Sequence, residues 1–144
     1  TITIADTATA ATGGGGTIKI INENVIYSHE NGHDDDGSAM TAYIETGDID
    51  LGEGDKTWSI HRIIPDIYFT NADTSDEVTI SINGHDFPAD TQSSIASSAF
   101  TSSTTQSFIR ARARQVSMKV QSDGLGYGWR VGFVRFDGRT DSRR

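Results

Sequence analysis

Residues 108–121 of the chain read FIRARARQVSMKVQ, and no other stretch says as much about the fold. In its first half two alanines alternate with arginines, and in its second half Val116, Met118 and Val120 alternate with polar residues. A period of two places successive side chains on opposite faces of a β-strand. The alternation slips by one residue at Gln115, which predicts a β-bulge that lets both halves face the same core.

The same period of two is found in other short segments. Residues 76–83 place Val78, Ile80 and Ile82 on one face, and Asn83-Gly84 after them is typical of a tight turn. Further β-branched or alternating runs predict strands at residues 17–21, 24–29, 40–46, 58–64, 66–70 and 129–137. We expect loops at residues 30–38, 47–56 and 88–107, and a polar, charged tail at residues 138–144.

Together these segments predict an all-β protein, an antiparallel β-sandwich or small barrel of about seven to eight strands. The chain has 17 Thr and 15 Ser but only two Leu, a composition that favours strand and loop over helix. Residues 1–16 are rich in Thr and Ala and end in four glycines, so we expect a flexible N-terminal arm or linker. A strand at residues 1–4 that pairs with another chain is the alternative for this arm. Residues 17–144 are expected to form a single sandwich domain.

Length and composition exclude several classes of protein. The chain has 144 residues, enough for one domain, and begins at Thr1, so we expect a processed chain or part of a longer subunit. No run approaches the roughly 18 to 20 apolar residues of a membrane-spanning helix. There is no Cys, which excludes disulfides, thiolate chemistry and zinc sites built on sulfur.

The charge is distributed unevenly along the chain. Residues 1–109 contain three basic and 17 acidic residues, whereas residues 110–144 contain nine basic and three acidic residues. The basic end pairs either with the acidic part of its own chain or with an acidic neighbouring subunit. We do not expect direct nucleic-acid binding, because the acidic part repels phosphate over a Debye length of about 8 Å.

Motifs that carry catalytic or metal chemistry are weak in this sequence. The acidic loops offer only weak calcium candidates, Asp34, Asp36, Asp48 and Asp50, because the spacing of a calcium-binding loop is missing. The four histidines show no HxH or HxxxH spacing, and no serine lies in a GxSxG motif. We therefore expect no enzyme activity, no metal site and no cofactor.

Several short motifs carry a resemblance to a known family. They are RIIPD at residues 62–66, RARQ at 112–115, SD at 122–123, GWRVG at 128–132, RFD at 135–137 and DSRR at 141–144. This series resembles the C-terminal signature of tail nozzle and hub proteins in the virions of short-tailed bacteriophages. The resemblance covers residues 40–144, and Ala113 and Ser142 stand where that family usually has glycine. It implies a β-rich domain in a ring-shaped assembly and localisation in the virion.

The leading hypothesis is therefore a non-enzymatic structural component of a phage tail or of its connection to the head. Its partners would be copies of itself and other virion subunits, contacted through the arginine-rich C-terminal strands. The interface candidates are Arg110, Arg112, Arg114, Trp129, Arg130, Arg135, Arg143 and Arg144. The alternative for Trp129 and Arg112 is a structural role, the first in the core and the second in an internal ion pair.

Two other hypotheses belong to different functional classes. A carbohydrate- or receptor-binding module on a phage fibre or capsid would stack sugar rings on Trp58, Tyr68 or Trp129. A tail-associated depolymerase is the weakest hypothesis, because no nucleophile or pair of acids stands out.

Overall fold

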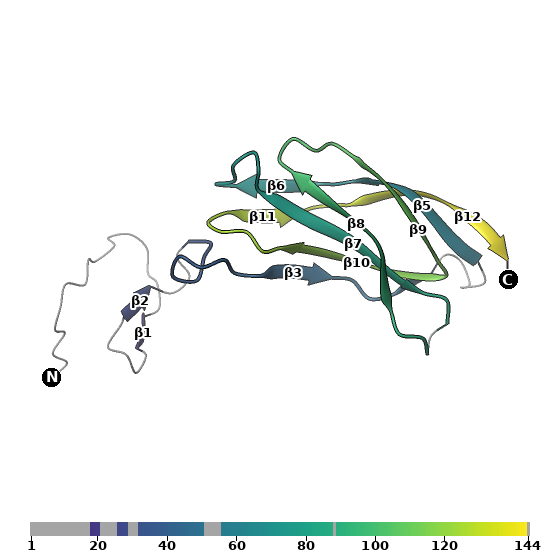
Figure 1. Cartoon of the computed structure of the whole chain (residues 1–144), viewed down its shortest axis with the longest axis horizontal. Helices are drawn as coiled ribbons and strands as arrows, with labels where there is room; N and C mark the ends of the chain where they lie inside the picture. The colour runs from purple at the N-terminus through teal and green to yellow at the C-terminus, as the bar shows by residue number, and fades with distance from the viewer. Residues whose placement is uncertain (1–17, 21–25, 29–31, 51–55, 88, 144) are drawn as a thin grey trace. The chain divides into compact units, whose positions relative to one another are not determined.

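The computed structural model describes residues 18–20, 26–28, 32–50, 56–87 and 89–143. The chain divides into two compact units, Thr1–Gly32 and His33–Arg144. The expected arm at residues 1–16 and its boundary with the sandwich lie outside the described residues. The described part contains strands, turns and bends, and none of it forms a helix of the length and apolarity needed to cross a membrane (Figure 1).

The described part of the first unit is one antiparallel pair of strands. β1 (Ile18–Ile20) pairs with β2 (Ile26–Ser28), with Ile18 opposite Ser28. β-branched residues favour this extended backbone. The strands expected around residues 17–21 and 24–29 are confirmed within the described residues.

The first sheet of the second unit has the strand order β3-β10-β7-β8. Its strands are β3 (Ala42–Glu45), β10 (Gln115–Ser122), β7 (Glu77–His85) and β8 (Ser93–Thr101). The two-residue strand β4 (Ile49–Asp50) pairs with the start of β10, while β3 pairs with its end. Since β7 occupies the other side of β10, β3 and β4 together form one edge of this sheet.

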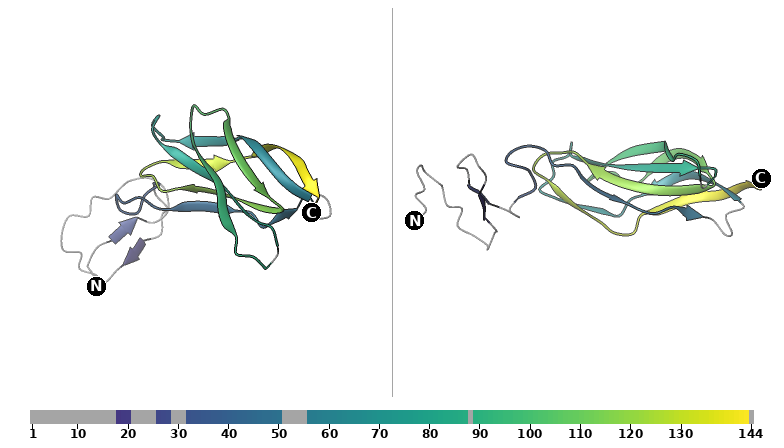
Figure 2. Two further views of the ribbon diagram at one scale, coloured as in Figure 1. Left: turned by 45° about the vertical axis from the view of Figure 1, so that its right-hand side comes forward. Right: turned by 90° about the horizontal axis from the view of Figure 1, so that it is seen from below.

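The second sheet of this unit has the order β12-β5-β9. It contains β12 (Arg135–Arg143), β5 (Lys56–Ile64) and β9 (Ser107–Ala113), and β12 runs beside β5 to the end of the described chain (Figure 2). Beyond a bend at Pro65, β6 (Ile67–Thr70) pairs with β11 (Gly128–Val131) and continues the β5–β12 pair. The N–H of Gly132 donates to the carbonyl oxygen of Asp66 at 2.7 Å and closes this bend.

The phase slip at Gln115 is not a β-bulge, and that prediction is wrong. β9 ends at Ala113 in the sheet of β5, and β10 begins at Gln115 in the sheet of β7, so the chain crosses between the sheets at Arg114. Ala113 from one sheet and Val116 from the other both point into the core. The alternation must restart, because the inward side of one sheet faces opposite to the inward side of the other.

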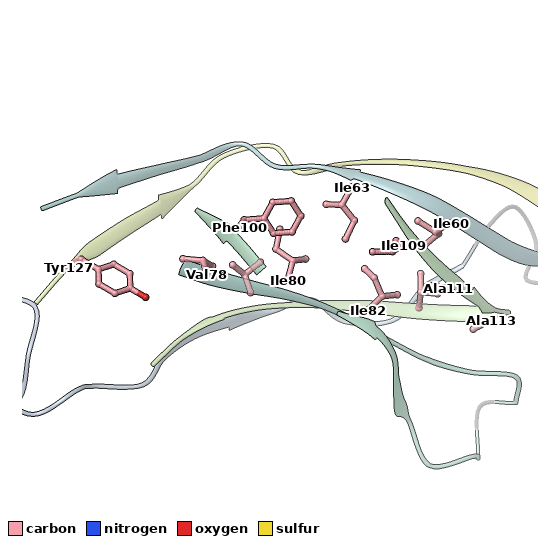
Figure 3. Packing of buried hydrophobic residues seen from close by; sticks show 12 residues of the cluster. Ile60, Ile63, Val78, Ile80, Ile82, Phe100, Ile109, Ala111, Ala113 and Tyr127 are labelled. Atoms are coloured by element: carbon pink, nitrogen blue, oxygen red, sulfur yellow. The ribbon is translucent and has the colours of Figure 1, made fainter. Parts of the chain in front are cut away.

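The core lies between the two sheets (Figure 3). The first sheet contributes Val78, Ile80, Ile82, Phe100, Val116 and Val120, and the second contributes Ile60, Ile63, Ile109, Ala111 and Ala113. Burying a side chain the size of Ile or Phe stabilises the fold by about 1.5–3 kcal/mol. Tyr127 closes one end of this core, and its hydroxyl donates to the carbonyl oxygen of Glu77 at 2.5 Å.

The all-β fold class is confirmed, as an antiparallel sandwich-like fold without a closed barrel in the described part. The described part has twelve strands, ten of them in the second unit, more than the seven or eight expected for residues 17–144. The loop predicted at residues 88–107 is wrong in part, because it contains β8. The tail predicted from residue 138 is also wrong, because β12 continues through it. Both strands lie at the edges of their sheets. The prediction of a tight turn at Asn83-Gly84 is also wrong, because β7 continues through both residues to His85.

Candidate functional site

The outer side of the β12-β5-β9 sheet is a surface rich in arginine. Along β9 the side chains of Ile109, Ala111 and Ala113 are buried, so Arg110 and Arg112 point outward and are exposed. On β12, Arg135 and Arg139 lie opposite outward positions of β5 and are exposed. We call this surface the Arg face and define it by Arg62, Phe108, Arg110, Arg112, Arg135, Asp137, Arg139 and Asp141.

Both aspartates of the Arg face are held by arginines of the same sheet. Arg62 Nε donates to Asp137 Oδ2 at 2.8 Å, and its Nη1 donates to Gln106 at 3.0 Å. Arg112 Nε lies 2.9 Å from Asp141 Oδ2. These pairs leave the surface with more arginines than aspartates, so its net charge is positive.

An exposed aromatic ring lies within the Arg face. Phe108 is 74% exposed and lies directly opposite Arg62 in the register of β9 and β5. Arginine and aromatic residues are enriched at protein interfaces, because both bury large areas and arginine adds planar hydrogen bonding. The combination identifies a surface suited to contact with an acidic partner.

The residues of the sequence signature contact one another across the fold. Asp66 of RIIPD packs against the end of the GWRVG motif. Its carboxylate accepts a hydrogen bond from the N–H of Phe133, the residue after this motif, at 2.9 Å. It also lies so close to Gly132 that an added Cβ atom there would be 2.4 Å from Asp66 Oδ2. The indole N–H of Trp129 donates to Ser122 Oγ of the SD motif at 2.8 Å. Arg62 of RIIPD pairs with the aspartate of RFD. These motif residues therefore have structural roles within the domain.

The other interface candidates are placed as follows. Trp129 is partly buried and packs against the core, in keeping with its structural alternative. Arg114 is partly buried at the crossing between the sheets, and Arg130 is exposed on β11 opposite Tyr68. Arg143 pairs in register with Lys56, although its side chain, like all of Arg144, lies outside what the structure describes.

A second exposed surface lies along the outer edge of the first sheet. On β3 and β4, Tyr43 is 63%, Ile44 50% and Ile49 42% exposed. Glu45, Asp48 and Asp50 lie on the same two strands and the turn between them, and each is exposed. We call this surface the acidic edge. Alternation at residues 40–46 predicted a strand here, but only pairing in the folded sheet shows that the strand lies at an edge.

The weak calcium candidates have other contacts. Asp34 accepts the N–H of Gly37 at 3.0 Å and stabilises a turn in which Asp36 has a positive φ of 51°. Asp48 accepts a hydrogen bond from Gln92 at 2.8 Å and lies 3.5 Å from His85 Nε2. Among the described residues, no three acidic or histidine side chains form a group that could hold a metal ion.

Two cavities lie at opposite ends of β7. The larger, about 480 Å³, is lined by residues that include His85, Asp90 and Arg112. The smaller, about 290 Å³, lies beside Tyr127, whose pKa is raised first by burial and then by the charge of Asp76. At its rim a hydrogen bond from Gln121 lowers the pKa of Asp123. Both cavities are lined mainly by polar residues, and Arg112 of the Arg face lines the larger one.

The sequence was also compared with known proteins. No family model matches it, and a search of curated proteins finds no significant match. The Arg face and the acidic edge are therefore interpreted from their own chemistry.

Proposed function

We propose that this chain is a non-catalytic structural component of a bacteriophage virion, located in the tail nozzle or hub or in the head-to-tail connection. The observation that carries this proposal is the Arg face, a basic surface with an exposed aromatic ring on a paired β-sheet. It serves to dock the domain onto acidic surfaces of neighbouring subunits.

The rigidity of the sheet favours this role. Arg110 and Arg112 are two residues apart on one strand, which separates their Cα atoms by about 6.8 Å and places both side chains on one face. Because the backbone is already ordered by pairing with β5, less conformational entropy is lost on docking than from a flexible basic tail. A contact of this kind weakens with rising salt, since exposed charge pairs are screened.

The resemblance to tail nozzle and hub proteins supplies the virion setting. The motifs that carry it join β5, β6, β10, β11 and β12 through the contacts around Asp66, Ser122 and Arg62. A signature made of such contacts supports a shared fold, while the exposed arginines beside it support a docking role. Nucleic acid is a poorer partner, because the whole chain has a net charge of -8.

Peptide mass spectrometry of virus particles purified from the source tests this proposal. We expect peptides of this chain at a constant ratio to the other virion proteins across the particle peak of a density gradient. The same peptides map which residues precede Thr1 in the particle. Absence of the chain from purified, infectious particles would overturn the proposal.

A matched pair of variants tests the role of the Arg face. Arg110→Glu changes the net charge by two on the Arg face, and Ser94→Glu with Ser97→Glu makes the same change on the outward side of β8. We expect the first variant to lower incorporation into particles by at least tenfold and the second to leave it unchanged. Equal incorporation of both variants would contradict docking through the Arg face.

A second candidate, a carbohydrate- or receptor-binding module, rests on one observation. Tyr68 is 67% exposed and lies opposite Arg130, a combination that can stack on and hydrogen-bond to a sugar ring. Trp58 and Trp129 pack against the core and are poor stacking platforms. Binding on a glycan array that is lost in Tyr68→Ala would favour this candidate, and a blank array with calcium present would count against it.

A further inference from the structure

We propose that the acidic edge of one copy docks onto the Arg face of a second copy, so that identical chains associate head to tail. This inference deepens the proposed function and takes its assembly setting from it. It adds the identity of the partner and the surface that the partner contributes.

The acidic edge has the features of an incompletely covered strand. β3 pairs with β10 on one side, and no described strand pairs with its other side. Ile44 lies opposite the buried Val120 yet is 50% exposed, and Ile49 lies opposite Val116 and is 42% exposed. An edge with open backbone groups and exposed apolar side chains readily takes a partner.

The charges of the two surfaces are complementary. Glu45, Asp48 and Asp50 give the edge three carboxylates, more than are matched by Lys119, which lies opposite Glu45 and over the Tyr43 ring at 4.7 Å. The Arg face offers guanidinium groups, which bind carboxylates through two parallel hydrogen bonds. Each surface also exposes an aromatic ring, Tyr43 on the edge and Phe108 on the Arg face.

Other modes of association fit these charges less well. Two Arg faces repel each other, and so do two acidic edges, which disfavours a two-fold contact made by either surface with itself. Within one copy the two surfaces belong to different sheets, with the shared core between these sheets. Contact between unlike surfaces of identical chains propagates from copy to copy and gives rings or open chains of more than two copies.

The test uses the complete 144-residue chain and measures self-association by sedimentation velocity and native mass spectrometry. We expect complexes of more than two copies that dissociate as the salt concentration rises. Arg110→Glu on the Arg face and Glu45→Lys on the acidic edge should each weaken association at least tenfold. A second edge variant, Asp50→Lys, guards against a local effect of losing the hydrogen bond from Asn83 Nδ2 to Glu45.

The decisive measurement mixes the two reversed variants. In an equal mixture of the Arg110→Glu and Glu45→Lys chains, each edge can meet a face of opposite charge, so association should return. Two controls place the same charge changes on the outward side of β8: glutamate at Ser94 and Ser97 matches the first variant, and lysine at both positions matches the second. Both controls should associate like the original chain.

Three results would overturn the inference: a chain that stays monomeric up to its solubility limit, a complex that closes at two copies, or a mixture that fails to recover. Circular dichroism of each variant separates loss of association from loss of folding. Particle mass spectrometry reports on the proposed function independently. A chain that is present in particles but does not associate in this way refutes the inference alone, and a chain that associates but is absent from particles refutes the virion role alone.

Discussion

Substituting Gly84 by alanine is the sharpest test of how the strands converge at the crossing between the sheets. Gly84 lies in β7 opposite Val116 of β10 and Ser93 of β8. A Cβ atom there would lie 2.5 Å from Ile95 Cδ1, 2.6 Å from Ala113 Cβ and 3.0 Å from a backbone oxygen of β10. The first two distances are far below van der Waals contact, so side chains or backbone must shift.

The expected cost of Gly84→Ala follows from this overpacking. Adding a methyl group to a close-packed core costs about 1–3 kcal/mol. For a domain of roughly 100 residues, each kcal/mol lowers the midpoint of thermal unfolding by about 4–8 °C. We therefore expect the midpoint to fall by about 4–24 °C.

The assay is urea and thermal unfolding, followed by tryptophan fluorescence and circular dichroism. Gly84→Ala should lower the urea midpoint without changing the slope, because the surface exposed on unfolding is the same. Gly47→Ala is the matched control, since a Cβ there meets no atom within 4 Å. Adding Ala113→Gly to the first variant removes one of the two closest clashes and should recover part of the loss. A Gly84→Ala chain as stable as the original would refute the close convergence of β7 with β8 and β9.

Three further substitutions test individual contacts of the fold. Phe100→Ala should lower the free energy of unfolding by about 3–5 kcal/mol, measured in urea, because Phe100 is 0% exposed in the core. Burial and the charge of Asp76 raise the pKa of Tyr127 above its ordinary value of 10.0, so the fold favours the neutral phenol. The stability that this preference contributes is complete below pH 10 and is lost as the pH rises through the raised pKa. Tyr127→Phe should cost about 1 kcal/mol at neutral pH and remove this alkaline loss, whereas an unchanged alkaline profile would contradict it. Asp137→Asn weakens the ion pair between Asp137 and Arg62, whose side chains are 48% and 35% exposed, respectively. The free energy of unfolding should therefore fall by less than about 1 kcal/mol, and by less still in high salt. A larger loss that does not depend on salt would show that another contact is involved.

Local sequence pattern is enough to predict the class of the fold and part of its core. Val78, Ile80 and Ile82 recur at a period of two, and the structure buries all three. This agreement has a local cause, because the alternation of side chains along a strand depends on the backbone of that strand alone. The same alternation placed Arg110 and Arg112 on the side opposite the core, so this pair of the Arg face was predictable.

Strands at sheet edges were harder to predict from local sequence. β8 contains only one fully buried large side chain, Phe100, and β12 alternates arginines and aspartates with few apolar residues. An edge strand is held mainly by backbone hydrogen bonds to one neighbour, and these bonds do not require an alternation of apolar and polar side chains. Pairing with β7 and β5 therefore decided these two strands.

The crossing of the chain between the sheets and the surfaces that it exposes follow from strand pairing in the folded protein. The phase slip at Gln115 fits a bulge within one strand as well as a crossing, and the partners of β9 and β10 distinguish the two. The pairing of Arg112 with Asp141 and the exposure of the β3–β4 edge likewise depend on strands distant in sequence. The physical reason is the same in each case: local pattern determines which way a side chain points, whereas long-range pairing determines what it meets.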